Sequence, residues 1–204
     1  MDRRNFVSAM TGLMLTAALP RLNATEKKVR GPVIAEAGRR VDAAGAMARF
    51  PPQNVEIVRE RIRRVLSNRK PIAIVSSAAC GADLLLLDVA GEMSIPRHIL
   101  LPSKPEEFRL SSVTDRPGNW GELYSEALRT STVEVLKLPE GQEGYLETNL
   151  KLLDHAQALA AREHTTVQAL VVWNRKSRGP DDVTEHFRKQ AELRDIPVIQ
   201  ISTL

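Results

Sequence analysis

Residues 72–90 limit the fold of this chain more than any other stretch. They begin with the β-branched apolar run 72–75, continue through the small residues 76–82, and end in an apolar, helix-compatible segment, 84–90. Such a strand, turn and helix form the unit of Rossmann-like sheets, in which backbone N–H groups and the helix dipole meet an anionic ligand. Small residues also let a strand pack closely on a helix without any ligand, so the pattern alone leaves both interpretations open.

Strand-like and helix-like segments alternate along the rest of the chain. Apolar runs bounded by turn residues predict strands at 32–37, 72–75, 98–101, 132–138, 167–173 and 196–201. Helix-compatible segments follow Asn54 and cover 84–90, 147–162 and 183–194. This alternation is typical of a mostly parallel sheet covered by helices on both faces, so we expect an α/β fold, a Rossmann-like three-layer sandwich.

Four loops are expected to follow the strand ends on one side of this sheet. In parallel sheets, ligands bind beyond the carboxyl ends of the strands. The segments expected there are the polar, glycine-bearing or irregular parts of the chain, at 38–42, 76–83, 102–120 and 174–184. Arg39 and Arg40 give the first loop a place for a phosphate or carboxylate, or else they are solvated charges on an exposed turn. Trp120 and Tyr124 either pack on a ligand or anchor the third loop.

The composition is that of one ordinary globular domain. The chain has 204 residues, of which 43% are hydrophobic and 26% charged, which is enough for a sizeable core. Aromatic residues make up only 4%, which argues against a stacking platform for single-stranded nucleic acid. The net charge is +4, and three arginines against one aspartate in residues 1–24 supply +2 of it. The remaining +2 requires no nucleic-acid partner.

The first 24 residues resemble a twin-arginine export signal. Arg3 and Arg4 precede an apolar stretch at 6–19, which is too short and too rich in small residues to predict a stable membrane span. We therefore expect a leader at 1–24, a linker at 25–31 and one ligand-binding domain at 32–204. The leader predicts export to the periplasm, and an ordinary N-terminal helix on a cytoplasmic protein is the alternative.

Neither the cysteine nor the histidines predict a reactive or metal-binding centre. Cys80 is the only cysteine, which excludes an intrachain disulfide. It lies in the small-residue turn, where a thiolate can be stabilised, but the sequence identifies no base beside it, so a small apolar filler is the simpler interpretation. The four histidines show no metal-ligand spacing. We therefore expect no metal and no cofactor.

Several short motifs are shared with one known group of proteins. They are Gly-Arg-Arg-Val-Asp at 38–42, Arg-Phe-Pro at 49–51, the turn at 76–84, Ser-Val at 112–113, Asp-Arg-Pro-Gly-Asn-Trp at 115–120 and Ala-Leu-Val-Val-Trp-Asn at 169–174. In combination they resemble the SLOG superfamily, the Rossmann-like domains that include the DNA-processing protein DprA (Smf) and the LOG phosphoribohydrolases. The resemblance covers most of residues 32–204 and implies a domain that binds a nucleotide-derived small molecule, as a sensor or binding module.

The strand-end loops and the resemblance together nominate a set of ligand-binding residues. The backbone amides of Gly81 and Ala82, with Arg40, are expected to hold phosphate. Asp83 is expected either to accept ribose hydroxyls or to serve as a favourable charge in the first helical turn. Trp120 is the candidate for base stacking. The full set is Gly38, Arg39, Arg40, Ser76, Ser77, Ala79, Gly81, Ala82, Asp83, Arg116, Trp120, Asn174 and Thr184.

The chain departs from the hydrolase branch of this superfamily. That branch carries a Pro-Gly-Gly-x-Gly-Thr-x-x-Glu signature, whereas residues 176–185 read Lys-Ser-Arg-Gly-Pro-Asp-Asp-Val-Thr-Glu. We therefore expect binding without catalysis and nominate no catalytic residue. One alternative is a nucleotide N-glycosidase. Its candidate acids would be Asp83, Asp115, Asp182 and Glu185. The other alternative is an exported interaction domain with a decayed pocket. A sensor of this kind would need an effector protein or a second copy as its partner.

Overall fold

The computed structural model describes residues 30–204, so the expected leader and most of the expected linker lie outside the described part. Its strands are β1 Val33–Gly38, β2 Ala73–Ser76, β3 Arg97–Leu101, β4 Thr132–Val135, β5 Val167–Trp173 and β6 Val198–Ser202. Its helices are α1 Val55–Arg69, α2 Ala82–Glu92, α3 Pro105–Phe108, α4 Trp120–Arg129, α5 Gln142–Arg162 and α6 Val183–Leu193, with short helical turns η1 Pro52–Asn54 and η2 Arg109–Val113. None of these described helices is long and apolar enough to cross a membrane.

The six strands form one sheet in the order β4-β3-β2-β1-β5-β6, and every neighbouring pair is parallel. The chain first adds β2, β3 and β4 on one side of β1 and then places β5 and β6 on the other side. The direction of winding therefore reverses between β1 and β5, and the crevice beyond their carboxyl ends is where ligands bind in folds of this type.

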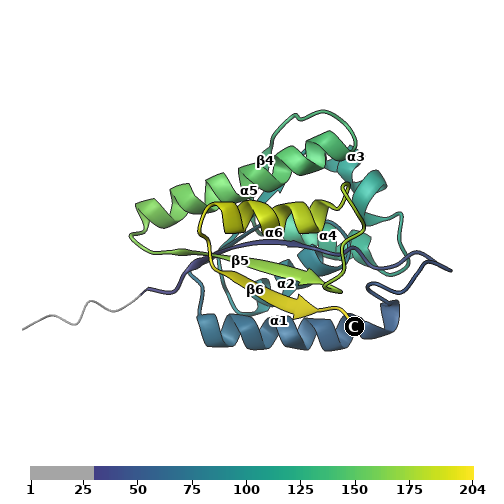
Figure 1. The fold of residues 1–204 in the computed structure, drawn as a ribbon, viewed down its shortest axis with the longest axis horizontal. Coiled ribbons are helices and arrows are strands. Elements are labelled where there is room, and N and C mark those ends of the chain that lie inside the picture. Colours follow the sequence, from purple (N-terminus) through teal and green to yellow (C-terminus); the bar gives the residue numbers. More distant parts are fainter. Residues whose placement is uncertain (1–29) are drawn as a thin grey trace, which may run out of the picture.

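Helices cover both faces of the sheet, as Figure 1 shows, with α1 on one side and α5 and α6 on the other. Alternate residues of β1 belong to the two different layers because successive strand side chains point to opposite faces. Ile34 packs in the cluster that contains residues of α1, α2 and α4, whereas Val33 packs in the cluster formed with α5 and α6. The expected α/β, Rossmann-like three-layer sandwich is confirmed.

The segment at 103–129 departs from the sequence-based expectation. The chain at 103–120 is not wholly irregular, because it contains α3 and η2, and α4 begins at Trp120. The side chains of Trp120 and Tyr124 are only 5% and 2% exposed, and both belong to the core cluster that includes α2. The indole Nε1–H of Trp120 donates to the carbonyl of Pro117 at 2.8 Å. Of the two roles considered for these rings, the structure therefore shows the anchoring one.

Candidate ligand-binding site

A cavity of about 600 Å³ opens at the carboxyl ends of the central strands, at the point where the winding direction reverses. Its wall comes from five separate stretches of the chain. These are the residues that follow β1, the turn between β2 and α2, the segment after β3, and the starts of α5 and α6. A volume of this size lies within the range of small-molecule sites.

The structure brings most of the nominated residues to this wall. Eight of the thirteen line the cavity: Gly38, Arg39, Arg40, Ser77, Ala79, Asp83, Arg116 and Thr184. The other five lie outside the lining: Ser76, Gly81, Ala82, Trp120 and Asn174. Proximity to the cavity is thus established for the eight lining residues, and contact with a ligand remains a prediction for all thirteen.

The turn between β2 and α2 is tight because two of its residues have left-handed backbone, Ala78 with φ 67° and Gly81 with φ 96°. A Cβ on Gly81 would lie 2.7 Å from both the carbonyl oxygen of Arg39 and the nitrogen of Val41. The N–H of Ala82 donates to that same Arg39 carbonyl at 3.1 Å. The chain after β1 therefore packs over the start of α2. Its Arg39 carbonyl already accepts the Ala82 N–H, which the sequence analysis expected to bind phosphate.

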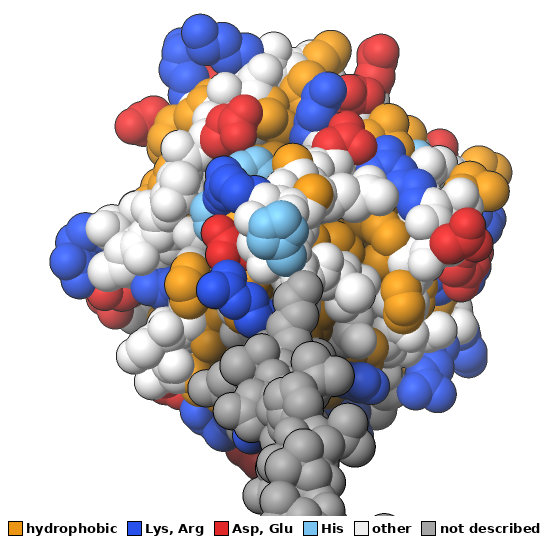
Figure 2. Space-filling view, turned by 90° about the vertical axis from the view of Figure 1, so that its left-hand side faces the viewer, with side chains coloured by type: hydrophobic (Ala, Val, Ile, Leu, Met, Phe, Trp, Pro, Cys, Tyr) orange, Lys and Arg blue, Asp and Glu red, His pale blue; other side chains and the backbone are white. Residues whose placement is uncertain are grey.

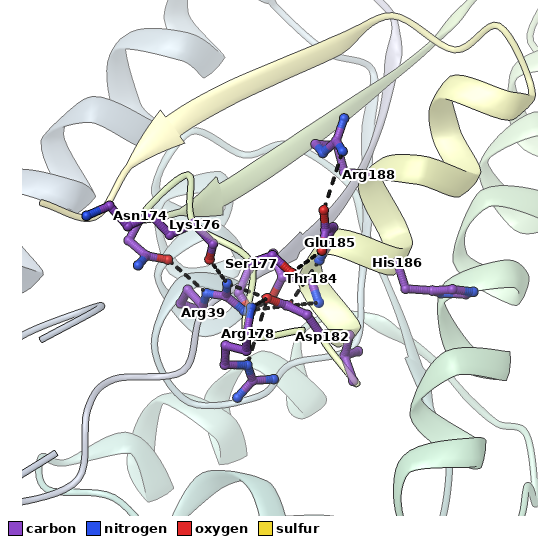
Figure 3. Close-up of polar contacts among 12 residues, drawn as sticks. Arg39, Asn174, Lys176, Ser177, Arg178, Asp182, Thr184, Glu185, His186 and Arg188 are labelled. Atoms are coloured by element: carbon purple, nitrogen blue, oxygen red, sulfur yellow. Dashed lines mark hydrogen bonds and ion pairs between the residues drawn. The ribbon is translucent and has the colours of Figure 1, made fainter. Parts of the chain in front are cut away.

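Arg39 is held in a buried ion pair, which Figure 3 shows in close-up. Its guanidinium donates to both carboxylate oxygens of Asp182, at 2.6 and 2.7 Å, and the exposed fractions of the two side chains are 4% and 0%. It also donates to Asn174 Oδ1 at 3.3 Å and to the carbonyl of Lys176 at 2.8 Å, and it lies 5.6 Å from the ring centroid of Trp173. With its donors so engaged, Arg39 fastens the loop after β5 to the end of β1.

Asp182 also caps helix α6. Its carboxylate accepts the backbone N–H groups of Thr184 at 3.0 Å and Glu185 at 3.1 Å, and that of Arg178 at 2.8 Å. Burial by itself would raise the pKa of Asp182, but the hydrogen bonds from Arg39 and from these amides outweigh it and hold the pKa at about 2. The carboxylate is therefore ionised at neutral pH and serves the architecture of the site.

The cavity wall as a whole is rich in positive charge, since five arginines, Arg39 included, and two aspartates line it. Arg40 donates to Asp115 at 2.6 Å and to the carbonyl of Ser111 at 2.8 Å, and Arg116 lies 3.6 Å from the same carboxylate. These two guanidiniums come from the loops after β1 and after β3, and they meet on one side of the cavity.

Arg178 brings positive charge from the loop before α6. Its side chain lines the cavity and is 45% exposed, with Nε 3.9 Å from the Asp182 carboxylate. Burial lowers the pKa of Arg178, and Asp182 opposes the shift. The like charges of Arg39, Arg49 and Arg40 lower it further. The arginines of this wall therefore lie close enough to repel one another, which a bound anion would relieve.

A closed loop carries Arg49 to the cavity. Asp42 accepts the backbone N–H groups of Arg49 at 2.8 Å and Phe50 at 2.9 Å, and its own N–H donates to the Phe50 carbonyl at 2.9 Å. These bonds fix the base of the loop, while Met47 near its tip lines the cavity and is 77% exposed. The Arg-Phe-Pro motif thus places its arginine beside the cavity and its phenylalanine in the core.

The start of α5 supplies lining residues that the sequence analysis did not nominate. Tyr145, Thr148 and Asn149 line the cavity, and the hydroxyls of Tyr145 and Ser112 lie 3.0 Å apart. The amide of Asn149 donates to the carbonyl of Val183 at 2.7 Å and so ties α5 to α6. Thr148 and Asn149 are both buried. Polar residues on an otherwise apolar helix face were the signal in the sequence that could have found them.

Asp83 alone among the four acids considered for catalysis lines the cavity. Its carboxylate accepts the Ser77 hydroxyl at 2.8 Å and the Ala79 N–H at 3.1 Å. Burial raises the pKa of Asp83 to about 6, although these two hydrogen bonds oppose the shift. This carboxyl therefore changes charge close to neutral pH, at the cavity surface.

Cys80 lies beside this acid and shows no sign of reactivity. Its side chain is buried, and burial raises the pKa of the thiol to about 12, so the thiolate needed for nucleophilic attack is scarce at neutral pH. Within residues 30–204, no group of three or more histidine, cysteine or acidic side chains is arranged to hold a metal ion.

The opposite end of the molecule has a different character. The arrowheads of β5 and β6 in Figure 1 point to the right, and Figure 2 looks at the left-hand side, where the strands begin. On the part of that face that is visible, basic and acidic side chains are interspersed with apolar ones. The collection of arginines described above belongs to the carboxyl end of the sheet.

No protein-family model matches the sequence, and no curated protein matches it either. Two solved structures of the DNA-processing protein DprA are similar in fold. One is from Streptococcus pneumoniae, with a TM-score of 0.41 and 12% identity over 84% of this chain, which spans 59% of that protein. The other, from Helicobacter pylori, binds single-stranded DNA and has a TM-score of 0.41 and 14% identity over 83% of this chain and 76% of its own.

The Moco carrier protein of Chlamydomonas reinhardtii is also similar, with a TM-score of 0.31 and 14% identity over 85% of this chain and 92% of its own. At these identities the likeness concerns the fold, and the function is argued below from the residues of the cavity.

Proposed function

We propose that this domain binds an anionic, phosphate-bearing ligand of nucleotide type in the cavity beyond β1 and β5. The observation that carries the proposal is the convergence of arginines from separate loops on one cavity, among them Arg40, Arg49, Arg116 and Arg178. A planar guanidinium recognises phosphate oxygens through paired hydrogen bonds, which makes arginine the side chain best suited to this task.

The remainder of the wall supports a ligand with a less polar part. Phe108, Tyr145, Val183 and Met47 line the cavity alongside the arginines. An aromatic ring and aliphatic side chains can contact a nucleobase, while the serine hydroxyls near Tyr145 can hydrogen-bond to its edge or to a sugar. A ligand with phosphates at one end and a base at the other matches this division.

Calorimetric titration with ADP-ribose, NAD, AMP and cyclic nucleotides tests the proposal. We expect at least one of them to bind, with an affinity that falls as the salt concentration rises. Replacing Arg116 or Arg178 by glutamine removes a charged donor that contributes about 1.5–3 kcal/mol, so each change should weaken binding roughly 10- to 100-fold.

Arg64→Gln provides the matched control. This arginine lies on α1, its guanidinium is 72% exposed, and it pairs with Glu60 at 3.2 Å. Its replacement should leave the affinity unchanged. An absence of heat with every nucleotide at millimolar concentration would contradict the proposal and favour the alternative of an interaction domain with a decayed pocket.

A further inference from the structure

A second carboxyl lies directly beneath the cavity, on the central strand. Glu36 is fully buried near the end of β1. Its Oε2 accepts the Ser76 hydroxyl at 2.9 Å, whereas its Oε1 is buried without any hydrogen-bond partner. An ionised carboxylate with an unsatisfied oxygen is costly to bury, so this position favours the neutral acid.

Gly38 separates this carboxyl from the cavity. A Cβ on Gly38 would lie 2.9 Å from Oε1 of Glu36 and 2.2 Å from the Cβ of Ala82, the residue just before Asp83 in α2. Gly38 itself lines the cavity, and so does Asp83, which is only 4% exposed. The two carboxyls therefore approach the same point from β1 and from α2, one below the cavity surface and one on it.

The elements packed around the two carboxyls differ in the ionisable groups that they carry. Strands β2 and β5, which flank β1, carry no ionisable side chain within Ala73–Ser76 or Val167–Trp173. Burial raises the pKa of Glu36 well above its usual range, the negative charge of Asp83 raises it further, and the Ser76 hydrogen bond opposes the shift. The turn contributes the Cys80 thiol, whose pKa the charge of Asp83 raises, and the loops contribute the guanidiniums that line the same cavity as Asp83.

We propose that an anion bound in this cavity is taken up together with one proton, which Asp83 carries, so that Asp83 meets the ligand as a hydrogen-bond donor. Glu36 stays neutral beneath it and adds no second negative charge. The inference rests on the proposed function, because it assigns a role to one residue of the same site. It reverses the role expected from the sequence, in which an ionised Asp83 accepts sugar hydroxyls.

The free protein provides the first test, by carbon-13 NMR titration of the two carboxyl groups between pH 4 and 9. We expect the pKa of Glu36 to lie well above the usual range of a glutamate and Asp83 to titrate near pH 6, the value to which burial raises its pKa. Asp83→Asn should move the titration of Glu36 to lower pH, because it removes the neighbouring negative charge. Ionisation of both carboxyls throughout this range would overturn the inference.

The bound state provides the second test. ADP-ribose is the probe, because its pyrophosphate is esterified at both ends, so each phosphate has only one, strongly acidic hydroxyl, which stays ionised across this pH range and adds no proton step of its own. Calorimetry in two buffers of different ionisation enthalpy should show an uptake approaching one proton per ligand above pH 6. The affinity should fall by up to tenfold for each pH unit above that point.

Asp83→Asn distinguishes the two roles of this residue. The asparagine amide is a permanent donor, so the variant should bind ADP-ribose at pH 8 as tightly as the unchanged protein does at pH 6, with no proton uptake. Weaker binding of the variant at every pH would instead support an ionised acceptor and overturn the inference. Asp88→Asn is the control on the same helix, since Asp88 pairs with Arg59 on α1 at 2.5 Å and should affect neither quantity.

Sulfate separates a failure of this inference from a failure of the proposed function. If ADP-ribose does not bind, the nucleotide proposal fails, and the NMR titration is repeated with sulfate as a simple anion. A rise in the titration midpoint of Asp83 on adding sulfate supports the proton-linked binding of anions. An unchanged midpoint overturns it.

Discussion

Asp182→Ala is expected to destabilise the domain by about 3–5 kcal/mol, the usual cost of removing one partner from a buried ion pair. The change leaves the Arg39 guanidinium buried without its carboxylate and removes the cap of α6. Chemical denaturation at pH 7 measures the loss as a lower denaturant midpoint. The proposed binding of ADP-ribose should be lost as well, because the loop that carries Arg178 is no longer fastened to β1.

The neighbouring residue offers a matched control. Asp181 is exposed, and its carboxylate accepts only a hydrogen bond from the side chain of Gln142 at 2.9 Å among the described residues, so Asp181→Ala should change the stability by less than about 0.5 kcal/mol. Equal effects of the two substitutions would contradict the role given to the ion pair. The double variant Arg39→Met with Asp182→Asn should cost less than the sum of the single changes, since neither charge is left unpaired.

The same ion pair predicts that the free energy of unfolding of the unchanged protein decreases at acidic pH. The pKa of Asp182 is lowered to about 2 in the fold, against about 3.9 in an unfolded chain. The folded state therefore binds this proton less tightly, and the stability that the carboxylate supplies is present above about pH 4 and is lost as the pH falls toward 2. Asp182→Asn should flatten that part of the curve.

Gly38→Val is expected to be the most damaging single change at the cavity itself. Even the Cβ would lie 2.2 Å from the Cβ of Ala82 and 2.9 Å from the carbonyl oxygen of Val172, so β1 and the first turn of α2 would have to separate. Overpacking of this kind costs roughly 1–3 kcal/mol or more. Thermal unfolding should show the loss of stability, and titration with ADP-ribose should show the loss of binding.

Two variants locate the cause of that loss. Gly45→Ala lies in the loop on the cavity rim, where an added Cβ meets nothing within 4 Å, and should cost only about 1–2 kcal/mol because its φ is +74°. Gly38→Ala combined with Ala82→Gly moves a methyl group from α2 to β1 and should recover part of the stability lost in Gly38→Ala alone. An absence of recovery would show that the crowding comes from the strand rather than from α2.

Much of the fold could be predicted because its signals are local. The run 167–173 is apolar, rich in valine and bounded by polar residues, and it is β5 without any change of bounds. Helix α4 was missed because its first residue closes the motif Asp-Arg-Pro-Gly-Asn-Trp at 115–120, whose proline and glycine are typical of a loop. The burial of Trp120 depends on α2, which no pattern within the loop reveals.

The position of the cavity could be predicted from the sequence, but the contacts made by the residues around it could not. The strand ends predicted the side of the sheet on which the cavity lies, and Arg40, Asp83 and Arg116 line that cavity. The engagement of Arg39 could not be foreseen, because its partner Asp182 lies 143 positions away. Glu36 was not singled out from the sequence, because the absence of a hydrogen-bond partner for its Oε1 depends on packing in three dimensions.

The order of the strands determines when this cavity can exist. Central strand β1 pairs on one side with β2, which follows closely in the chain, and on the other with β5, which is made far later. During synthesis from the amino terminus, β1 to β4 can associate while Arg39 still lacks its carboxylate. The long-range pairing of β1 with β5 is also the slow kind of contact to form. The cavity is therefore completed only when residues up to α6 have emerged, so a ligand bound there could not assist the earlier steps of folding.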